Sequence, residues 1–320
     1  MSKSPPQRRA VIDVGTNSVK LLVADISDSG IIPVCEESKQ TRLGRGFYET
    51  HLLQADAISA TAEAVQKFAA QAKTLNAVNL RVFATSAARD AINASDLLNA
   101  IESSSGLRVE VISGEQEADW VFAGVATDPK LANLPLLILD VGGGSTEFIL
   151  GKGHHQHFRN SFRLGTVRLL ELLQPGEPPG VEALAHCRHW LKEFLDKQIA
   201  PALESAIRAW ASKIQLVGTG GTTTILARME KQLLEFDREK IEATRLTLEQ
   251  VRAHVERIWN LPLEERKKII GLPPKRADVI LTGVAIYEAV MERFGFEELR
   301  ISTRGLRYAA LLHSSSLLCK

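Results

Sequence analysis

Apolar residues come in short runs at the start of the chain, and the same pattern returns later. An apolar run at 10–12 ends in Asp13, passes through Gly, Thr, Asn and Ser, and resumes as a second apolar run at 19–24. A second copy has the same order around Asp140 and resumes at 148–151. The returning runs are short, apolar and β-branched, which is typical of strands and not of a helix start. Each copy therefore predicts a strand, a glycine-containing turn and a returning strand.

The rest of the chain predicts alternating helices and strands. This order indicates an α/β protein with mixed sheets, and the polar stretch 126–135 is the predicted linker between two halves. Helices are expected at 54–75, within 86–104, from 113, over 181–208 and at the C-terminus, and strands at 31–37, 80–84, 107–112, 157–162, 214–217 and 299–301.

Composition limits the classes of protein that fit. A length of 320 residues predicts about two domains, and 45% hydrophobic residues can fill their cores. The balance of 39 basic against 38 acidic residues argues against nucleic acid as the partner. Residues 1–9 lack a signal-peptide core, and no apolar stretch approaches the roughly 20 residues of a membrane span. We therefore expect a cytoplasmic protein with no membrane partner.

The two turns carry the candidate chemistry. Backbone N–H groups and hydroxyls in such a turn can surround an anion, and glycine allows the positive φ values that aim several N–H groups at one point. Either turn alone could be an ordinary hairpin, but the repetition favours phosphate binding. The predicted phosphate-binding residues are Thr16, Asn17 and Ser18 in the first turn and Gly143, Gly144, Ser145 and Thr146 in the second. Asp140 and Glu147 are the predicted ligands of a hydrated Mg²⁺ or another divalent cation, and Asp13 is predicted to act as a further ligand or to orient water.

Seven segments in this order resemble the Ppx/GppA phosphatases, the family of exopolyphosphatases and guanosine pentaphosphate phosphohydrolases. They are AVIDVGTNSVKLLVAD, FATSAARDAINA, ISGEQEADWVFAGV, LILDVGGGSTEFILG, FRLGTVRL, LVGTGGTTT and ISTRGLRYAAL. The resemblance implies two ribonuclease-H-like domains of the actin-like ATPase superfamily that flank a cleft. It places the first domain at 1–126, the second at 127–302, and at 303–320 a C-terminal helix that packs back on the first.

The resemblance also assigns roles to single residues. In the family motif that matches Ser-Gly-Glu-Gln-Glu, the second acidic position is the catalytic base, which is Glu117 here. Glu115 points elsewhere on the helix, so the two are not expected to act as a pair. The alternative is that both acids only favour a helix N-terminus. Arg89 and Arg276 lie in matching motifs and are candidates to bind phosphate oxygens, although a solvated surface position is the commoner fate of arginine.

Three classes of function remain. The first is metal-dependent hydrolysis of the terminal phosphoanhydride of inorganic polyphosphate, and its close alternative is 5'-phosphohydrolysis of guanosine pentaphosphate (pppGpp). A kinase or nucleotide switch of the actin-like superfamily is disfavoured by Glu117, and a polyphosphate-binding module without activity is disfavoured by Glu117, Asp140 and Glu147. The family resemblance suggests a homodimer. Longer family members carry a further helical domain, so short or medium polyphosphate chains are the expected substrates.

Two further features each have more than one interpretation. The turn Gly218–Thr222 could meet an anion or a nucleotide base, or it could be a helix cap. The tract His154–His157 resembles a metal-binding tract but falls at a predicted hairpin tip, where exposed polar residues are expected.

Overall fold

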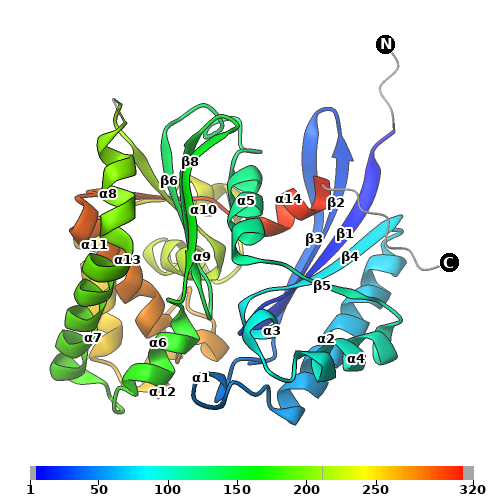
Figure 1. Cartoon of the computed structure of the whole chain (residues 1–320), viewed down its shortest axis with the longest axis horizontal. Coiled ribbons are helices and arrows are strands. Elements are labelled where there is room, and N and C mark those ends of the chain that lie inside the picture. The colour runs from blue at the N-terminus through cyan, green and yellow to red at the C-terminus, as the bar shows by residue number, and fades with distance from the viewer. Residues whose placement is uncertain (1–4, 211, 313–320) are drawn as a thin grey trace. The chain divides into compact units, whose positions relative to one another are not determined.

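The computed structural model describes residues 5–210 and 212–312. The chain divides into two compact units, one formed by Met1–Thr127 with Leu306–Lys320 and the other by Asp128–Gly305. These are called the first and the second unit, and each has its own sheet (Figure 1). Each also has its own hydrophobic core. The chain passes from the first unit to the second between Thr127 and Asp128, within the stretch 126–135.

The first unit is built on a five-stranded sheet of order β3-β2-β1-β4-β5. Strands β1, β2 and β3 are antiparallel neighbours, whereas β1, β4 and β5 run parallel. The carboxyl ends of these three parallel strands therefore share one edge, which is where α/β proteins place their ligand-binding loops. The strands are β1 (Gln7–Val14), β2 (Ser18–Ser27), β3 (Gly30–Gln40), β4 (Asn79–Ala84) and β5 (Val109–Val111).

Helices cover this sheet on both faces. Ala10 and Ile12 of β1 belong to the core that α2 completes, while the alternate residue Arg9 donates a hydrogen bond to the Leu311 carbonyl of α14, 3.0 Å away. Arg307 of α14 also donates to the Leu21 carbonyl at 3.1 Å. Residues 313–320 of the predicted C-terminal helix lie outside the described residues. The helices are α1 (Phe47–Thr50), α2 (Ala55–Thr74), α3 (Ser86–Asp90), α4 (Ala94–Ser105), α5 (Gly114–Val125) and α14 (Leu306–Leu312).

The second unit repeats this plan with one extra strand. Its sheet has the order β10-β11-β9-β6-β7-β8, in which β6, β7 and β8 are antiparallel neighbours and β6, β9 and β11 run parallel. Strands β8-β7-β6-β9-β11 therefore correspond to β3-β2-β1-β4-β5. The strands are β6 (Leu136–Val141), β7 (Thr146–Lys152), β8 (His155–Phe162), β9 (Gln215–Thr219), β10 (Arg245–Thr247) and β11 (Glu298–Ile301).

One helical stretch of the second unit departs from regular α geometry. The predicted helix at 181–208 is observed as α7, a π-helical turn η1 and α8. The Ala200 N–H donates to the Leu195 carbonyl, five residues back, and Pro201 follows directly. Because proline has no N–H and its ring clashes with the preceding turn, it cannot continue the α pattern, and the wider turn accommodates it.

The second unit holds α6 (Thr166–Leu173), α7 (Gly180–Phe194), η1 (Leu195–Ile199), α8 (Ala200–Arg208), α9 (Gly220–Glu230), α10 (Arg238–Ala243), α11 (Leu248–Trp259), α12 (Leu263–Arg266), η2 (Pro274–Arg276) and α13 (Ile280–Phe294). Among the described residues, no helix combines the length and the apolar character that crossing a membrane would require.

Candidate functional site

The two glycine turns adopt the same local geometry. In the first turn (Gly15–Ser18) the Gly15 N–H donates to the Ser18 carbonyl at 3.1 Å, and in the second (Gly142–Ser145) Gly142 donates to Ser145 at 2.9 Å. A Cβ would stand 3.1 Å from the Ser18 oxygen at Gly15 and 3.0 Å from the Ser145 oxygen at Gly142. No glycine of the two turns has a positive φ, so the positive φ values expected of these turns are not observed. Gly15 and Gly142 instead allow the close backbone approach.

The residues that flank the two turns differ in charge. Asp13 is directly opposite Lys20 across β1 and β2, whereas Asp140 is directly opposite Glu147 across β6 and β7. Directly opposed residues project from the same face of a sheet. The Lys20 Nζ lies 3.9 Å from Asp13 Oδ2, so the first turn carries an ion pair. The second turn carries two carboxylates.

This acidic pair fits a divalent cation. Like charges directly opposite one another are destabilising unless a cation or a proton compensates them. Glu147 is 1% exposed and accepts a hydrogen bond from Ser161 Oγ at 2.7 Å, so its carboxylate is fixed in place. No group of three or more His, Cys, Asp or Glu that could hold a metal is found in the described part of the chain. Two carboxylates suit Mg²⁺, which usually keeps water and phosphate as its other ligands.

Arg89 and Glu117 meet at the edge of the first sheet. Glu117 lies in the first turn of α5, which Ser113 caps by accepting from the Gln116 N–H at 3.1 Å. Its side chain is buried, and Arg89 Nη1 donates to Glu117 Oε2 at 3.0 Å. Glu115 on the same helix is exposed. The sequence could not predict the Arg89–Glu117 contact, because the two residues lie on different helices, 28 positions apart.

The end of β3 and the two residues that follow it hold the first turn in place, a contact that the sequence did not predict. Thr41 and Arg42 donate their backbone N–H groups to the Asn17 carbonyl at 3.2 and 3.1 Å. Gln40 Nε2 donates to Asn17 Oδ1 at 3.0 Å. The Asn17 Nδ2 atom is buried and has no hydrogen-bond partner among the described residues. Since buried donors are almost always paired, this amide is suited to donate to a ligand oxygen.

The second turn is held from the other side by α6. The Thr166 N–H donates to the Gly142 carbonyl, and the Val167 and Arg168 N–H groups both donate to the Gly143 carbonyl. The Thr146 hydroxyl donates to the Leu164 carbonyl at 2.5 Å, and Thr146 is fully buried. Its hydroxyl therefore anchors the turn within the fold. Thr16, Ser18 and Ser145 are also buried.

Among the residues that hold the second turn in place, Gly165 should tolerate an added side chain least. A Cβ at Gly165 would stand 2.5 Å from the backbone atoms of Gly143 and Gly144. We expect Gly165→Ala to displace the second turn and to destabilise the second unit by about 1–3 kcal/mol, the usual cost of overpacking. Urea unfolding measures the change, with Gly176→Ala as control because its Cβ would be 3.8 Å from its nearest neighbour. Equal stability of the two variants would contradict this role.

Arg276 lies beside the N-terminus of α9. A Cβ at Gly221 would stand 3.2 Å from Arg276 Nη2, and one at Gly220 would stand 2.4 Å from Asp140 Oδ1. Gly220 has a φ of 87°, a left-handed value that glycine adopts without strain. Burial lowers the pKa of Arg276, while Asp278 acts in the opposite direction. The structure therefore brings Asp140, the first residues of α9 and Arg276 together in the second unit.

The buried Asp13 makes stability depend on pH. Burial raises the pKa of Asp13, and Lys20 and Arg307 offset part of the rise. Its stabilising contribution is fully present below the unfolded pKa of about 3.8 and is lost as pH rises through the higher folded pKa. We expect Asp13→Asn to raise the melting temperature of the first unit at pH 8 by about 2–4 °C, and not at about pH 3. Calorimetry at both pH values checks this, and an equal shift at both would contradict it.

Two α/β units with the same strand order, each with a glycine turn after its first strand, define an actin-like ATPase fold of two domains, as the sequence predicted. The chain belongs to the Ppx/GppA phosphatase family, whose model matches residues 22–316. It is 31% identical over 310 residues to Exopolyphosphatase 2 of Mycobacterium tuberculosis (strain CDC 1551 / Oshkosh), an alignment that covers 92% of this chain and 94% of that protein.

Solved structures agree with this assignment. The Aquifex aeolicus member of the Ppx/GppA protein family is 31% identical, with a TM-score of 0.78 and coverage of 96% of this chain and 97% of that one. An exopolyphosphatase from Cytophaga hutchinsonii is 28% identical, with a TM-score of 0.85 and coverage of 96% and 97%. The family identified from the sequence motifs is therefore confirmed.

Proposed function

We propose that this chain is a metal-dependent exopolyphosphatase, which releases orthophosphate by hydrolysing the terminal phosphoanhydride bond of inorganic polyphosphate. The similar Mycobacterium tuberculosis and Cytophaga hutchinsonii proteins are both named exopolyphosphatases. The observation that carries the proposal is the opposed pair Asp140 and Glu147 at a glycine–serine turn, because it suits a cation bound to phosphate oxygens.

Each unit contains donors that are proposed to bind phosphate. Hydrolysis of a phosphoanhydride depends mainly on positioning and charge neutralisation. The Asn17 Nδ2 atom, which has no hydrogen-bond partner among the described residues, supports a role for the first turn, and the position of Arg276 beside the start of α9 supports a role for that arginine. The proposed phosphate-binding residues are Thr16, Asn17, Ser18, Arg89, Gly143, Gly144, Ser145 and Arg276, with Thr146 acting through the position of its turn.

Glu117 is the proposed general base. Its carboxylate takes a proton from a water molecule as the water oxygen attacks the terminal phosphorus, and the bond from that phosphorus to the bridging oxygen breaks. Arg89 holds the carboxylate in one orientation through Nη1. Its Nη2 makes no hydrogen bond within the described residues and is placed to bind a phosphate oxygen.

Asp140 and Glu147 are the proposed ligands of Mg²⁺. A bound Mg²⁺ neutralises charge on the phosphate oxygens. Asp13 already faces Lys20, so a role in orienting the attacking water suits it better than a role as metal ligand. The proposal therefore assigns the base to the first unit and the metal ligands to the second.

A phosphate-release assay tests the proposal. Polyphosphates of several defined lengths are compared with pppGpp and ATP, each with Mg²⁺ and with EDTA. We expect release from short and medium polyphosphates that depends on the metal. Faster release from pppGpp than from every polyphosphate would assign the chain to nucleotide hydrolysis, and absence of release from all polyphosphates would overturn the proposal.

A further inference from the structure

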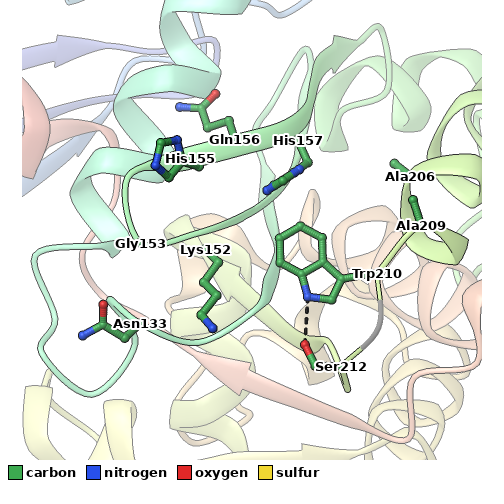
Figure 2. Close-up of a pocket in the computed structure, with 10 residues that line it drawn as sticks. All are labelled: Asn133, Lys152, Gly153, His155, Gln156, His157, Ala206, Ala209, Trp210 and Ser212. Carbon is green, nitrogen blue, oxygen red and sulfur yellow. Dashed lines mark hydrogen bonds between the residues drawn. The ribbon is translucent and has the colours of Figure 1, made fainter.

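A second concave site lies at the far end of β7 from the glycine turn. It is a cavity of about 820 Å³ in the second unit, lined by the β7–β8 hairpin tip, by Ala206 of α8 and by Ala209, Trp210 and Ser212 (Figure 2). Thr146 at the turn and Lys152 at the cavity are six positions apart on β7. At a rise of about 3.3 Å per residue they are separated by about 20 Å, so this cavity is distinct from the candidate phosphate site.

The walls of this cavity combine an aromatic surface with basic side chains. The Trp210 indole meets the His157 ring edge to face, with centroids 4.4 Å apart, and its Nε1 donates to Ser212 Oγ at 2.9 Å. Figure 2 shows Trp210 beneath His157, with Lys152 on the neighbouring strand of the hairpin. No Asp or Glu occurs among the lining residues, and Lys152 has no ion pair within the described part of the chain. The site therefore favours a ligand that is both flat and negatively charged.

Gln156 lines the cavity without aiming its amide into it. Its Oε1 atom is buried and has no hydrogen-bond partner among the residues that the structure describes, and Figure 2 shows the side chain pointing away from Trp210 and Lys152. The histidines of the tract His154–His157 do not form a metal cluster within the described residues. His155, Gln156 and His157 instead line a cavity of the size that small ligands occupy.

We propose that this cavity binds a purine nucleotide. The flat base packs against the Trp210 indole, and the phosphate binds Lys152. Aromatic stacking and a lysine–phosphate contact are general ways to hold such a ligand. A purine fits better than a pyrimidine because its larger ring system covers more of the indole. This inference does not depend on the proposed phosphatase activity.

Calorimetric titration of AMP and GMP into the whole chain tests the inference. We expect one saturable site for at least one of them, and binding weakened about tenfold or more by Trp210→Ala and by Lys152→Ala. Trp210→Phe keeps an aromatic ring and should retain most of the affinity. Lys192→Ala, which removes an exposed lysine of α7 outside the cavity, should change nothing.

Two results would overturn the inference. One is no binding of either nucleotide at millimolar concentration, and the other is binding that Trp210→Ala and Lys152→Ala leave unchanged. Melting curves show whether each variant is folded. Lys152 is exposed, so Lys152→Ala should remain folded and still tests the inference if Trp210→Ala does not fold. The cavity variants should retain the phosphate-release rate that the wild type shows without nucleotide.

Discussion

Glu117→Gln is expected to lower kcat for phosphate release from polyphosphate by about 10²- to 10⁴-fold, the contribution typical of a general base. Glutamine keeps an oxygen that can accept the Arg89 hydrogen bond, now at 3.0 Å, but it cannot take a proton from water. Binding of polyphosphate should therefore persist while turnover is lost. Single-turnover release and equilibrium binding of a defined polyphosphate separate the two effects.

Glu115→Gln is the matched control for this prediction. Glu115 lies on the same first turn of α5 and is exposed, so its substitution should leave kcat within about twofold of the wild type. Turnover of Glu117→Gln comparable to that of the wild type would remove Glu117 from the role of base. An equal loss in both variants would indicate damage to the helix and not to the chemistry.

Asp140→Asn is expected to change activity and stability in opposite directions. Removing one of two opposed carboxylates weakens a Mg²⁺ site, so the Mg²⁺ concentration for half-maximal activity should rise about tenfold or more. In EDTA the same substitution removes repulsion from Glu147, and the second unit should become more stable by about 0.2–1 kcal/mol. Metal titration of activity and urea unfolding in EDTA measure the two effects.

An exposed carboxylate provides the comparison for Asp140→Asn. Glu264 on α12 pairs with Lys267 at 2.6 Å and is exposed, so Glu264→Gln should alter neither the metal requirement nor the stability appreciably. An unchanged metal requirement in Asp140→Asn would contradict the assignment of this carboxylate. Lower stability of Asp140→Asn in EDTA would show that the carboxylate is already compensated within the fold.

Local sequence patterns were sufficient to predict both hairpins. Strands β1 and β2 pair around the first turn, and β6 and β7 pair around the second, as the two apolar runs of each copy indicate. These predictions succeeded because period and turn chemistry are local properties. The α/β class and the order of most helices and strands followed in the same way. The π turn before Pro201 did not, because a proline shows that regular α hydrogen bonding is interrupted but not which kind of turn replaces it.

The charge difference between the two turns was visible in the sequence but needed the strand register to be interpreted. Lys20 and Glu147 both lie seven positions after the aspartate of their copy. Only the strand register shows that Asp13 is opposite a lysine, Lys20, whereas Asp140 is opposite a second carboxylate, Glu147. From spacing alone, Asp13, Asp140 and Glu147 were all candidates for the metal site. In the structure, Asp140 and Glu147 form an opposed pair, whereas Asp13 is opposite a lysine.

Contacts between distant segments could not be predicted from one sequence. Arg89 and Glu117 were both candidates, but their hydrogen bond depends on the parallel pairing of β4 with β5, which brings α3 and α5 to one edge. The position of Gly165 against Gly143 is likewise set by where α6 begins. Motifs identify such residues, and the sheet order decides which of them meet.

The fate of the water oxygen tests the central claim most directly. Polyphosphate is hydrolysed in oxygen-18 water with Mg²⁺, and the released orthophosphate and the shortened chain are analysed by mass spectrometry. If water attacks the terminal phosphorus with Glu117 as base, the heavy oxygen appears in the orthophosphate, and Glu117→Gln slows its appearance by about 10²-fold or more. Label in the shortened chain, or release that requires a second phosphoryl acceptor, would contradict the account.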